Sequence, residues 1–356
     1  MKKKTVIFTG GHHNSALEIA KTLRKEGVNI LWIGHKFAAS GDKSLSAEYQ
    51  EVTNNQIKFI ELKTGKFYRK NLIEWLKVAF GFFQSGLYLM KYRPNLIFSS
   101  GGYLAVPVVI MGWLLRVPSI THEQTVVAGW ANKAIAPFVK KILLTHQSSL
   151  KNYSAEKSVV VGLPIRKELL QKKYTKKFTP PLLYVTCGKQ GSHVINQALF
   201  PIIPKLAEKF TIVHQTGANT KYKDTERARR LKEKLGENKS RYRHSPYYFS
   251  QDAVTYLRSA KVIVGRAGAH HSYELLVLSK KAVLIPIPWV SHNEQLLNAQ
   301  LVAKTTGSLI LEEKDLTPDT LFHAIIELGK APKTITPITL PIDATEKVVT
   351  IIHQYL

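Results

Sequence analysis

The sequence is poor in cysteine, because Cys187 is the single one among 356 residues. One thiol forms no disulfide within the chain, and it excludes every metal centre that is built from several cysteines. A reducing compartment is compatible with this composition.

Long apolar runs are also lacking. No uninterrupted apolar segment reaches the roughly 18 residues that a helix needs to span a bilayer. The first apolar run, Val6–Phe8, is too short for the apolar core of a secretory signal. We therefore expect a soluble chain whose contact with a membrane, if it has one, is peripheral.

Acidic side chains are scarce relative to basic ones. The chain has 25 Asp and Glu against 51 Lys and Arg, a formal net charge of +26, and the excess is spread along the whole length. Such a field favours phosphates, anionic lipid surfaces or nucleic acid. A compositional bias toward lysine explains the same charge, so both interpretations stay open. With 44% hydrophobic and 21% charged residues, a folded globular chain is expected.

The order of sequence patterns predicts two α/β domains. A strand at Thr5–Phe8, a glycine turn, a helical pattern up to Gly27 and a strand at Val28–Gly34 make a βαβ unit, which implies a parallel sheet. The pattern restarts with a strand at Leu182–Thr186, a glycine turn and a helical pattern over 195–206. Further strands are predicted at residues 96–98, 119–121, 141–144, 158–161, 211–214, 261–264 and 282–285.

Residues 171–181 are polar and basic and end in two prolines, which is typical of a linker. We therefore expect an N-terminal domain over 1–170 and a C-terminal domain over 182–340. Residues 341–356 have one apolar helical face and are expected to pack back on the N-terminal domain. The predicted fold class is α/β, with two doubly wound Rossmann-like domains facing across a cleft, and ligands beyond the carboxyl ends of the strands.

Glycine turns and polar clusters follow several predicted strands. Gly10-Gly11 precedes a helix, and His12 stands at the helix start, where the dipole disfavours the cation and a neutral imidazole suits a general base. A solvated loop histidine is the plainer alternative. Small residues before the helix at 269–274 would let backbone amides meet a pyrophosphate, and Glu274 could accept ribose hydroxyls.

Several complete motifs are absent. There is no G-x-G-x-x-G, no G-x-x-x-x-G-K-[ST] and no Asp-x-Asp, so neither a dinucleotide fingerprint nor a carboxylate-held metal is expected. The expectation is no cofactor and no metal ligand set, although a loosely bound Mg²⁺ is not excluded by sequence.

Residues 72–90 are apolar on almost every side and have basic residues before and after them. A helix with Trp and Phe between basic flanks can lie in a lipid interface. A buried core helix fits the same pattern, so we keep both interpretations. In the first, Trp75, Phe80, Phe82 and Phe83 contact the membrane.

These motifs together resemble the MurG family, the glycosyltransferases of peptidoglycan synthesis within glycosyltransferase family 28. The resemblance runs from about residue 5 to residue 311 and rests on eight motifs in the family's order. They are Thr9-Gly10-Gly11-His12, Gly101-Gly102-Tyr103, His122-Glu123-Gln124 with Gly129 and Asn132-Lys133, Gly162-Leu163-Pro164-Ile165-Arg166, Gly188-Lys189-Gln190-Gly191, His214-Gln215-Thr216-Gly217, Arg266-Ala267-Gly268-Ala269 with Glu274, and Gln295 with Asn298-Ala299.

The resemblance implies a GT-B fold and an inverting hexosyltransferase. Such an enzyme moves N-acetylglucosamine from UDP-N-acetylglucosamine to a polyprenyl-pyrophosphate-linked muramoyl-pentapeptide, and works as a peripheral protein on the cytoplasmic face of the plasma membrane. His12 would be the catalytic base. The implied UDP-sugar contacts are Thr9, Gly10, Gly11, Thr125, Arg166, Lys189, Ser250, Ala269, His270, His271, Ser272, Tyr273, Glu274, Glu294 and Gln295. The implied acceptor and phosphate contacts are Gly101, Gly102, Tyr103, His122, Glu123 and Gln124.

The chain departs from the family pattern at several positions. The first glycine loop is shortened, Thr125 replaces an asparagine, Lys189 replaces a serine, and His270-His271 replace a Leu-Thr pair. The expected partners are a UDP-sugar, a polyprenyl-linked acceptor and an anionic membrane surface. Two alternatives remain: a related GT-B enzyme with another UDP-sugar or lipid acceptor, and a non-enzymatic polyanion-binding protein. No nucleic-acid-binding motif is present, so nucleic acid is not an expected partner.

Overall fold

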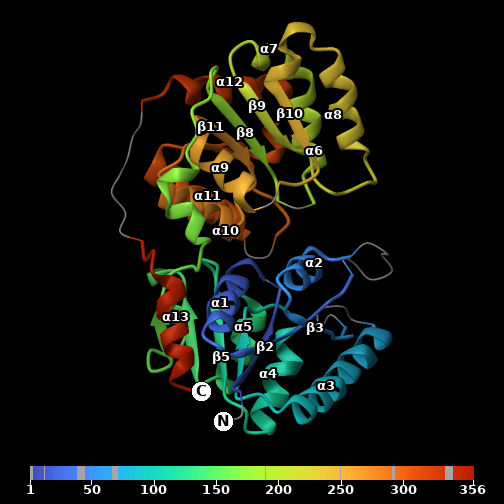
Figure 1. Cartoon of the computed structure of the whole chain (residues 1–356), viewed down its shortest axis with the longest axis vertical. Helices are drawn as coiled ribbons and strands as arrows, with labels where there is room; N and C mark the ends of the chain where they lie inside the picture. Colours follow the sequence, from blue (N-terminus) through green and yellow to red (C-terminus); the bar gives the residue numbers. More distant parts are fainter. Residues whose placement is uncertain are drawn as a thin grey trace. The chain divides into compact units, whose positions relative to one another are not determined.

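The computed structural model describes residues 3–11, 13–37, 45–65, 71–188, 190–248, 250–290, 293–332 and 340–356. Its contacts divide the chain into two compact units (Figure 1). The first unit joins Met1–Ile165 to Pro341–Leu356, and the second unit is Arg166–Leu340. Two predicted site residues, His12 and Lys189, lie outside the described residues, and only the backbone of Ser250 is described.

The first unit is built on a seven-stranded parallel sheet in the order β3-β2-β1-β4-β5-β6-β7. Because the chain starts in the middle and moves outward in both directions, the sheet has a switch point between β1 and β4. The strands are β1 (Thr5–Thr9), β2 (Asn29–Gly34), β3 (Lys58–Glu61), β4 (Leu96–Ser99), β5 (Ser119–Glu123), β6 (Lys141–Leu144) and β7 (Ser158–Val160).

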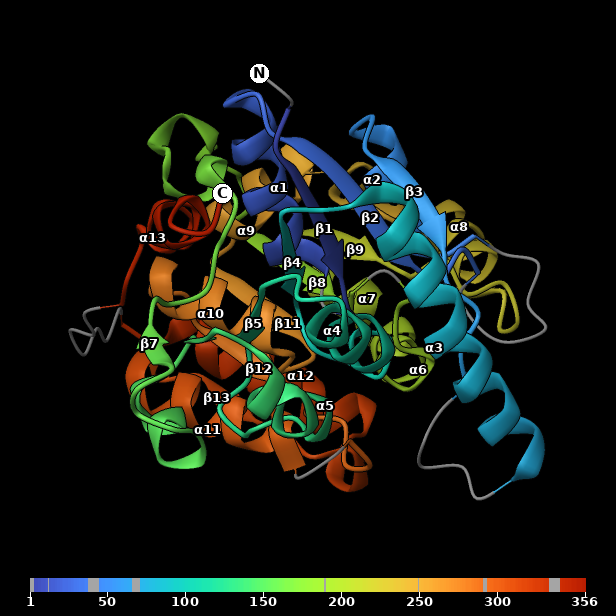
Figure 2. The same cartoon turned by 90° about the horizontal axis from the view of Figure 1, so that it is seen from below.

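Helices cover both faces of this sheet (Figures 1 and 2). One face is packed by α1 and α13 around Phe8 and Trp32, whose rings stack with centroids 5.5 Å apart. The other face is packed by α3, α4 and α5. The helices are α1 (His13–Lys25), α2 (Ala47–Asn54), α3 (Leu72–Tyr92), α4 (Ala105–Leu114), α5 (Trp130–Ile135), the 3-10 helices η1 (Ala136–Phe138) and η2 (Gln147–Asn152), and α13 (Ala344–His353).

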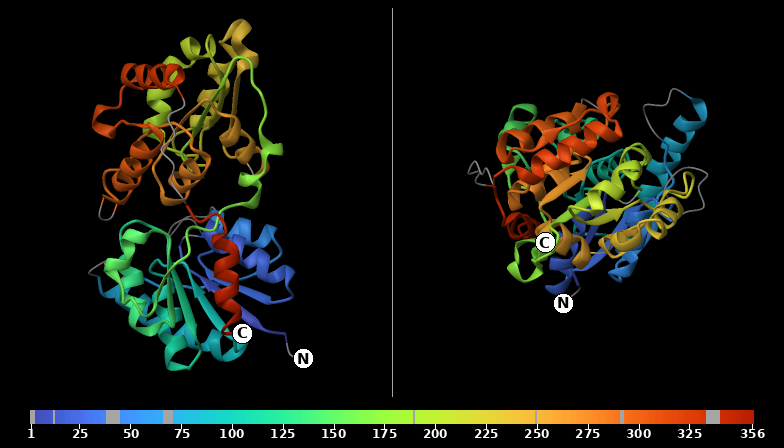
Figure 3. Two further views of the ribbon diagram at one scale, coloured as in Figure 1. Left: turned by 90° about the vertical axis from the view of Figure 1, so that its left-hand side faces the viewer. Right: turned by 90° about the horizontal axis from the view of Figure 1, so that it is seen from above.

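The last helix, α13, completes the first unit rather than the second (Figure 3). Val348, Val349 and Ile352 belong to the same buried cluster as the apolar face of α1. The His353 ring lies 2.6 Å from a carboxylate oxygen of Glu26 at the end of α1. The carboxyl-terminal residues thus lie where the apolar pattern of 341–356 predicts.

The second unit has a six-stranded parallel sheet in the order β10-β9-β8-β11-β12-β13, with its switch point between β8 and β11. Its strands are β8 (Leu182–Thr186), β9 (Thr211–Gln215), β10 (Tyr242–Ser245), β11 (Val262–Gly265), β12 (Ala282–Leu284) and β13 (Leu309–Ile310). Its helices are η3 (Lys167–Leu170), η4 (Lys172–Tyr174), α6 (His193–Leu199), η5 (Phe200–Ile202), α7 (Ile203–Ala207), α8 (Asp224–Glu233), η6 (Gly236–Arg241), α9 (Ser250–Ser259), α10 (Ala269–Leu278), α11 (Glu294–Thr306), η8 (Glu313–Asp315) and α12 (Pro318–Lys330).

Two boundaries differ from the sequence-based prediction. The single helix expected over 195–206 is divided into α6, η5 and α7, because Pro201 and Pro204 each lack the N–H that a continuous helix needs. The segment predicted as a linker, 171–181, belongs to the second unit, which begins at Arg166. It is held there by bonds such as that from Lys176 N to Ser259 Oγ, at 2.8 Å.

Candidate active site

The carboxyl ends of β1 and β4 meet at the switch point of the first sheet. Backbone bonds tie the two following loops together: Ser100 N donates to Thr9 O at 2.8 Å, and Gly11 N donates to Gly101 O at 3.0 Å. Gly10 has φ +123°, and a Cβ there would lie 2.5 Å from Gly101 O. Only glycine fits this close crossing of two turns. The side chain of Thr9 beneath it is buried.

Glu123 organises the loop that follows β5. Its Oε2 accepts from Gly129 N at 2.7 Å, Asn132 Nδ2 at 3.1 Å and Tyr153 Oη at 2.7 Å. Its Oε1 accepts from Thr125 Oγ1 at 2.9 Å. A buried carboxylate with this many donors is satisfied within the protein. Glu123 and Thr125 therefore serve the structure of this loop, whatever ligand the loop contacts.

The neighbouring predicted acceptor residues are equally enclosed. His122 is fully buried, with Nε2 3.0 Å from Gly162 O, and Gln124 Oε1 lies 3.5 Å from Ser15 Oγ. Tyr103 is partly exposed, and its ring lies 5.6 Å from that of His35. Among the predicted acceptor side chains, Tyr103 is thus the one with an accessible surface.

Two glycine loops approach each other at the carboxyl ends of β8 and β9 in the second unit. Gly191 has φ +73°, and a Cβ there would lie 2.2 Å from Thr216 O. The facing Gly217 has φ +97°, and its Cβ would lie 2.3 Å from Gln190 O. The two motifs Gly188–Gly191 and His214–Gly217 therefore contact each other through their backbones, and each has a glycine at the point of contact.

Arg266, which follows β11, connects three parts of the second unit. Its guanidinium donates to Ser192 Oγ at 2.7 Å and to Ile285 O at 3.1 Å, and it forms an ion pair with Glu313. No sequence pattern predicted this cluster, because Ser192 and Glu313 are 121 residues apart in the chain. The arginine fixes the loop at residues 265–268 against its surroundings.

The amino terminus of α10 presents backbone N–H groups beside this loop. Gly268 is the N-cap and no side chain caps the helix. Ala267 O accepts from Asn298 Nδ2 at 3.1 Å, and Gly265 O accepts from Ile285 N at 2.9 Å, so the approach to the helix is held from two sides. Within the described part of the chain, the buried Ser272 Oγ has no hydrogen-bond partner. These groups make a set of donors suited to an anion.

Glu274 lies on the second turn of α10 and is almost fully buried. Its Oε1 accepts from Arg166 Nη2 at 2.8 Å and lies 3.7 Å from His270 Nδ1. Burial raises the pKa of the Glu274 carboxyl, but Arg166 and the two histidines lower it by more, so its pKa lies below the ordinary value. In the described residues, Oε2 makes no hydrogen bond or ion pair. An ionised carboxylate thus keeps one oxygen for another partner.

The remaining predicted donor residues of the second unit lie around α10 and α11. His271 is partly buried, and the desolvation of its ring lowers its pKa below the ordinary value. Tyr273 is fully buried, and Gln295 Oε1 accepts from Ile287 N at 3.1 Å. Glu294 is the first residue of α11. The structure brings Arg166, His270 and Glu274 together, while Tyr273 and Gln295 support the fold around them.

The helix α3 carries its large apolar side chains outward. Its buried positions are mostly small, Val78, Gly81, Ser85, Gly86 and Leu89, whereas Phe80 is 50% and Phe83 63% exposed. The other exposed apolar residues of α3 are Leu72, Ile73, Trp75, Leu76, Leu87 and Met90. Phe82 instead is partly buried and packs against the core of the first unit. No helix in the described residues has the length and apolarity to cross a membrane.

Comparison with known proteins shows which protein family the chain resembles. Residues 5–144 match the glycosyltransferase family 28 N-terminal domain, and residues 182–354 match the glycosyltransferase family 28 C-terminal domain. A Clostridium tetani protein named UDP-N-acetylglucosamine--N-acetylmuramyl-(pentapeptide) pyrophosphoryl-undecaprenol N-acetylglucosamine transferase is 32% identical over 332 residues, which cover 89% of this chain and 87% of the relative. The protein of the same name from Clostridium kluyveri is 30% identical over 371 residues and covers 99% of both chains.

A solved structure agrees with this relationship in fold. The crystal structure of Acinetobacter baumannii MurG matches with a TM-score of 0.66 and 20% sequence identity, over 99% of each chain. Both parallel sheets and their alternating helices are thus those of GT-B glycosyltransferases. With two family models that together match most of the chain and relatives of 30% and 32% identity over nearly its whole length, this chain belongs to glycosyltransferase family 28, in its MurG-like branch.

Proposed function

We propose that this protein transfers N-acetylglucosamine from UDP-N-acetylglucosamine to a muramoyl-pentapeptide linked to undecaprenyl pyrophosphate. The observation that carries this proposal is the near end-to-end match with two relatives that are named for that reaction. The products are the disaccharide-linked lipid and UDP. The lipid acceptor makes the cytoplasmic face of the plasma membrane the proposed place of action, with the protein bound peripherally.

The donor nucleotide would bind at the carboxyl end of the second sheet. Glu274 is ionised, and its Oε2 is available to accept a ribose hydroxyl, while Arg166 holds Oε1. The diphosphate would lie at the amino terminus of α10, where the backbone N–H groups of Ala269, His270 and His271 and the hydroxyl of Ser272 supply donors. These are hydrogen bonds that strengthen as negative charge develops on the leaving UDP.

Transfer with inversion requires one proton movement and one displacement. A base takes the proton of the acceptor hydroxyl, the acceptor oxygen bonds to the anomeric carbon, and the bond from that carbon to the diphosphate oxygen breaks. We assign the base to His12, on the resemblance of Thr9-Gly10-Gly11-His12 to the family motif. We propose that no resident metal takes part, because the sequence has no Asp-x-Asp and the diphosphate charge falls on helix N–H groups.

The exposed apolar face of α3 would bind the protein to the membrane surface. Phe80, Phe83 and Trp75 are at least half exposed, and exposed Trp113 and Leu114 lie at the end of α4, which packs beside α3. Lys91 and Arg93, both exposed at the carboxyl end of α3, add positive charge beside this apolar face. Aromatic side chains and lysines in this arrangement suit an interface that contains anionic lipid.

A second candidate is a related transferase with another UDP-sugar or lipid acceptor. It is favoured by the residues at which the chain departs from the family, above all His270, which contacts Glu274 in the proposed donor site. The same fold with altered contacts at a site takes different substrates.

The deciding experiment measures transfer of radiolabelled sugar to the undecaprenyl-linked muramoyl-pentapeptide. UDP-N-acetylglucosamine is compared with UDP-glucose, and the variant His12→Ala is the catalytic control. Transfer from UDP-N-acetylglucosamine alone, with a much reduced kcat and a nearly unchanged donor KM in the variant, is the expected result. Equal or better transfer from UDP-glucose would favour the second candidate, and activity that survives His12→Ala would remove His12 as the base. Activity in excess EDTA checks the proposal that no metal is needed.

A further inference from the structure

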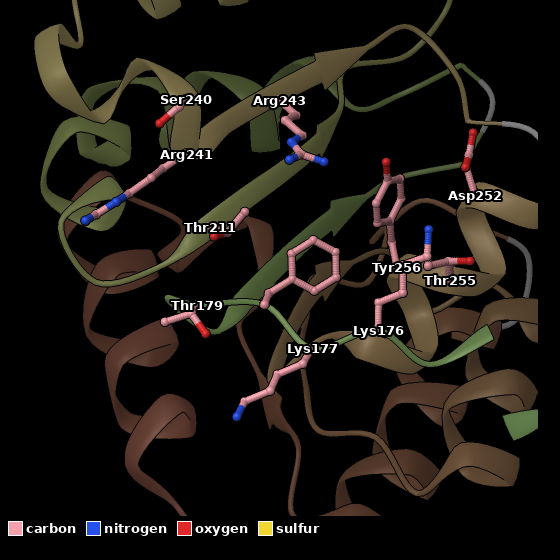
Figure 4. Close-up of a pocket in the computed structure, with 11 residues that line it drawn as sticks. Lys176, Lys177, Thr179, Thr211, Ser240, Arg241, Arg243, Asp252, Thr255 and Tyr256 are labelled. Carbon is pink, nitrogen blue, oxygen red and sulfur yellow. The ribbon is translucent and has the colours of Figure 1, made fainter. Parts of the chain in front are cut away.

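A cavity of about 490 Å³ lies in the second unit, away from the proposed donor site (Figure 4). It is lined by Thr211, the first residue of β9, and by Arg243, the second residue of β10, together with residues of α9. Because all strands of this sheet are parallel, these residues lie near the amino-terminal edge, whereas Gly268 follows the carboxyl end of β11. The cavity is therefore separate from the amino terminus of α10.

Positive charge in the lining is not balanced. Lys176, Lys177, Arg241 and Arg243 line the cavity with one carboxylate, Asp252. The guanidinium of Arg241 is engaged elsewhere, donating to the carbonyls of Ala207 and Glu208 at 3.2 Å each.

The other cations differ in their direction and their partners. Figure 4 shows Arg241 and Lys177 pointing away from Tyr256, while Arg243 extends toward the space beside that ring. Within the described residues, neither Lys176 Nζ nor the guanidinium of Arg243 has a hydrogen bond or ion pair. Two unpaired cations thus share one concave surface.

A fixed aromatic wall stands beside these two cations. The ring of Tyr256 lies 6.5 Å from that of Phe178, 5.7 Å from that of Tyr184 and 5.0 Å from that of Tyr248, measured between centroids. Tyr256 and Phe178 are only partly buried, so each keeps some ring surface toward the cavity. Rings packed in this way offer a flat apolar surface at little entropic cost on binding.

We propose that this cavity binds a small organic phosphate that is different from the donor nucleotide. The phosphate would accept hydrogen bonds from Arg243 and Lys176, since guanidinium and ammonium groups are the usual partners of phosphate. The apolar or cyclic part of the ligand would lie against Tyr256 and Phe178. A volume of about 490 Å³ is in the range of small-molecule sites. This inference does not depend on the proposed glycosyl transfer.

Adenosine monophosphate is a suitable probe, because it joins a phosphate to a flat ring and lacks the uracil of the donor. Calorimetric titration of the full chain with adenosine monophosphate should give saturable binding, and adenosine should bind far more weakly. Arg243→Gln and Lys176→Gln should each raise the Kd for adenosine monophosphate about tenfold. Both side chains are exposed, and matching thermal melts would show that the variants fold.

Lys177→Gln is the matched control, because it removes the same charge from a side chain that points away from the cavity. It should leave the Kd within about twofold, as should Glu274→Ala in the proposed donor site. The proposal is wrong if adenosine monophosphate does not bind, if adenosine binds equally well, if Lys177→Gln weakens binding as much as Arg243→Gln, or if Glu274→Ala abolishes it. Vesicles of phosphatidylglycerol form a second arm. Vesicle binding that needs Arg243, without binding of adenosine monophosphate, would assign the cations to lipid headgroups and overturn the small-ligand site.

Discussion

Arg166 and Glu274 are joined by an ion pair of 2.8 Å although 108 residues separate them in the chain. The arginine is the first residue of the second unit, and the glutamate lies on α10. Burial penalises the charge of Glu274, and Arg166 together with His270 and His271 more than offsets the penalty. The pair therefore keeps a carboxylate ionised in the interior and holds one of its oxygens in place.

Glu274→Gln should weaken donor binding, because an amide replaces the anionic acceptor of the ribose hydroxyls. A charged hydrogen bond contributes about 2 kcal/mol, so the KM for the UDP-sugar should rise roughly 30-fold with a smaller effect on kcat. Steady-state kinetics give both constants. In the parent protein, uridine diphosphate should bind more tightly than its 2′-deoxy form; equal affinity would contradict the ribose role.

Arg166→Ala should make donor binding depend on pH. Without the guanidinium, the largest influence that lowers the pKa of Glu274 is lost, so burial moves this pKa upward and the carboxyl takes up a proton at a higher pH than in the parent. The KM of this variant should therefore increase from pH 8 to pH 5, while that of the parent stays flat. Arg166→Lys keeps a cation and should restore much of the flat profile. A flat profile in Arg166→Ala would show that the ion pair does not control the charge of Glu274.

Gly191→Ala should destabilise the second unit, and Gly188→Ala offers a matched comparison. Both glycines have positive φ, +73° and +72°, so both variants carry a backbone penalty of about 1 kcal/mol. Only at Gly191 would the new Cβ collide with a backbone atom, Thr216 O at 2.2 Å. Urea unfolding should show a loss about 2 kcal/mol larger for Gly191→Ala. Equal losses would mean that the loop containing Gly217 moves away freely.

His214 should contribute to loss of stability in mild acid. It is fully buried, between Tyr242 Oη at 3.0 Å and Asn196 Oδ1 at 2.9 Å, and burial lowers its pKa to about 3, with a smaller effect of His244. Between pH 6.5 and 3 the unfolded chain binds a proton here that the folded chain does not, so stability falls as pH falls.

The loss that His214 causes at pH 5 is about 2 kcal/mol. His214→Gln should start from a lower stability but lose about 2 kcal/mol less than the parent between pH 7.5 and 5. Urea unfolding at the two pH values measures the difference. Parallel losses in both proteins would exclude His214 as a source of the acid sensitivity.

Phe80→Ser combined with Phe83→Ser should reduce binding to anionic liposomes without unfolding the protein, because both rings are at least half exposed. Trp289→Ser is the control, since Trp289 is 77% exposed on the second unit, outside α3. Sedimentation with liposomes measures the bound fraction. A loss as large in Trp289→Ser would point to general apolar adhesion rather than to α3. Phe82 is unsuitable for this test because it is partly buried and packs against the core, so its replacement would also destabilise the first unit.

The sequence predicts the strands well, because strands such as β1, β8 and β11 are buried on both faces and appear as short apolar runs before glycine turns. It missed β3 and β10, whose exposed positions interrupt the apolar pattern at Lys58 and Arg243, and the two-residue edge strand β13. Edge strands of this kind need the rest of the sheet for their identification.

Contacts within the candidate site were predictable where the two residues are close in the sequence. They were not predictable where the fold brings distant segments together. His270 and Glu274 are four residues apart on one helix, so their approach follows from helical periodicity. The partnership of Arg266 with Ser192 and Glu313 joins three distant segments and has no local signal. A polar residue of a sequence motif can also serve the fold alone. Glu123 is such a case, because its carboxylate accepts hydrogen bonds from groups within the protein.

The return of α13 to the first unit has a consequence for biosynthesis. That unit's hydrophobic core includes Ile352 of α13, which is translated after every strand of both sheets. Until α13 has left the ribosome, the apolar face of α1 stays uncovered and the first unit is incomplete, although the strands of its sheet were synthesised earlier. Premature termination shortly before α13 should therefore leave a product that exposes apolar surface, aggregates readily and depends on chaperones.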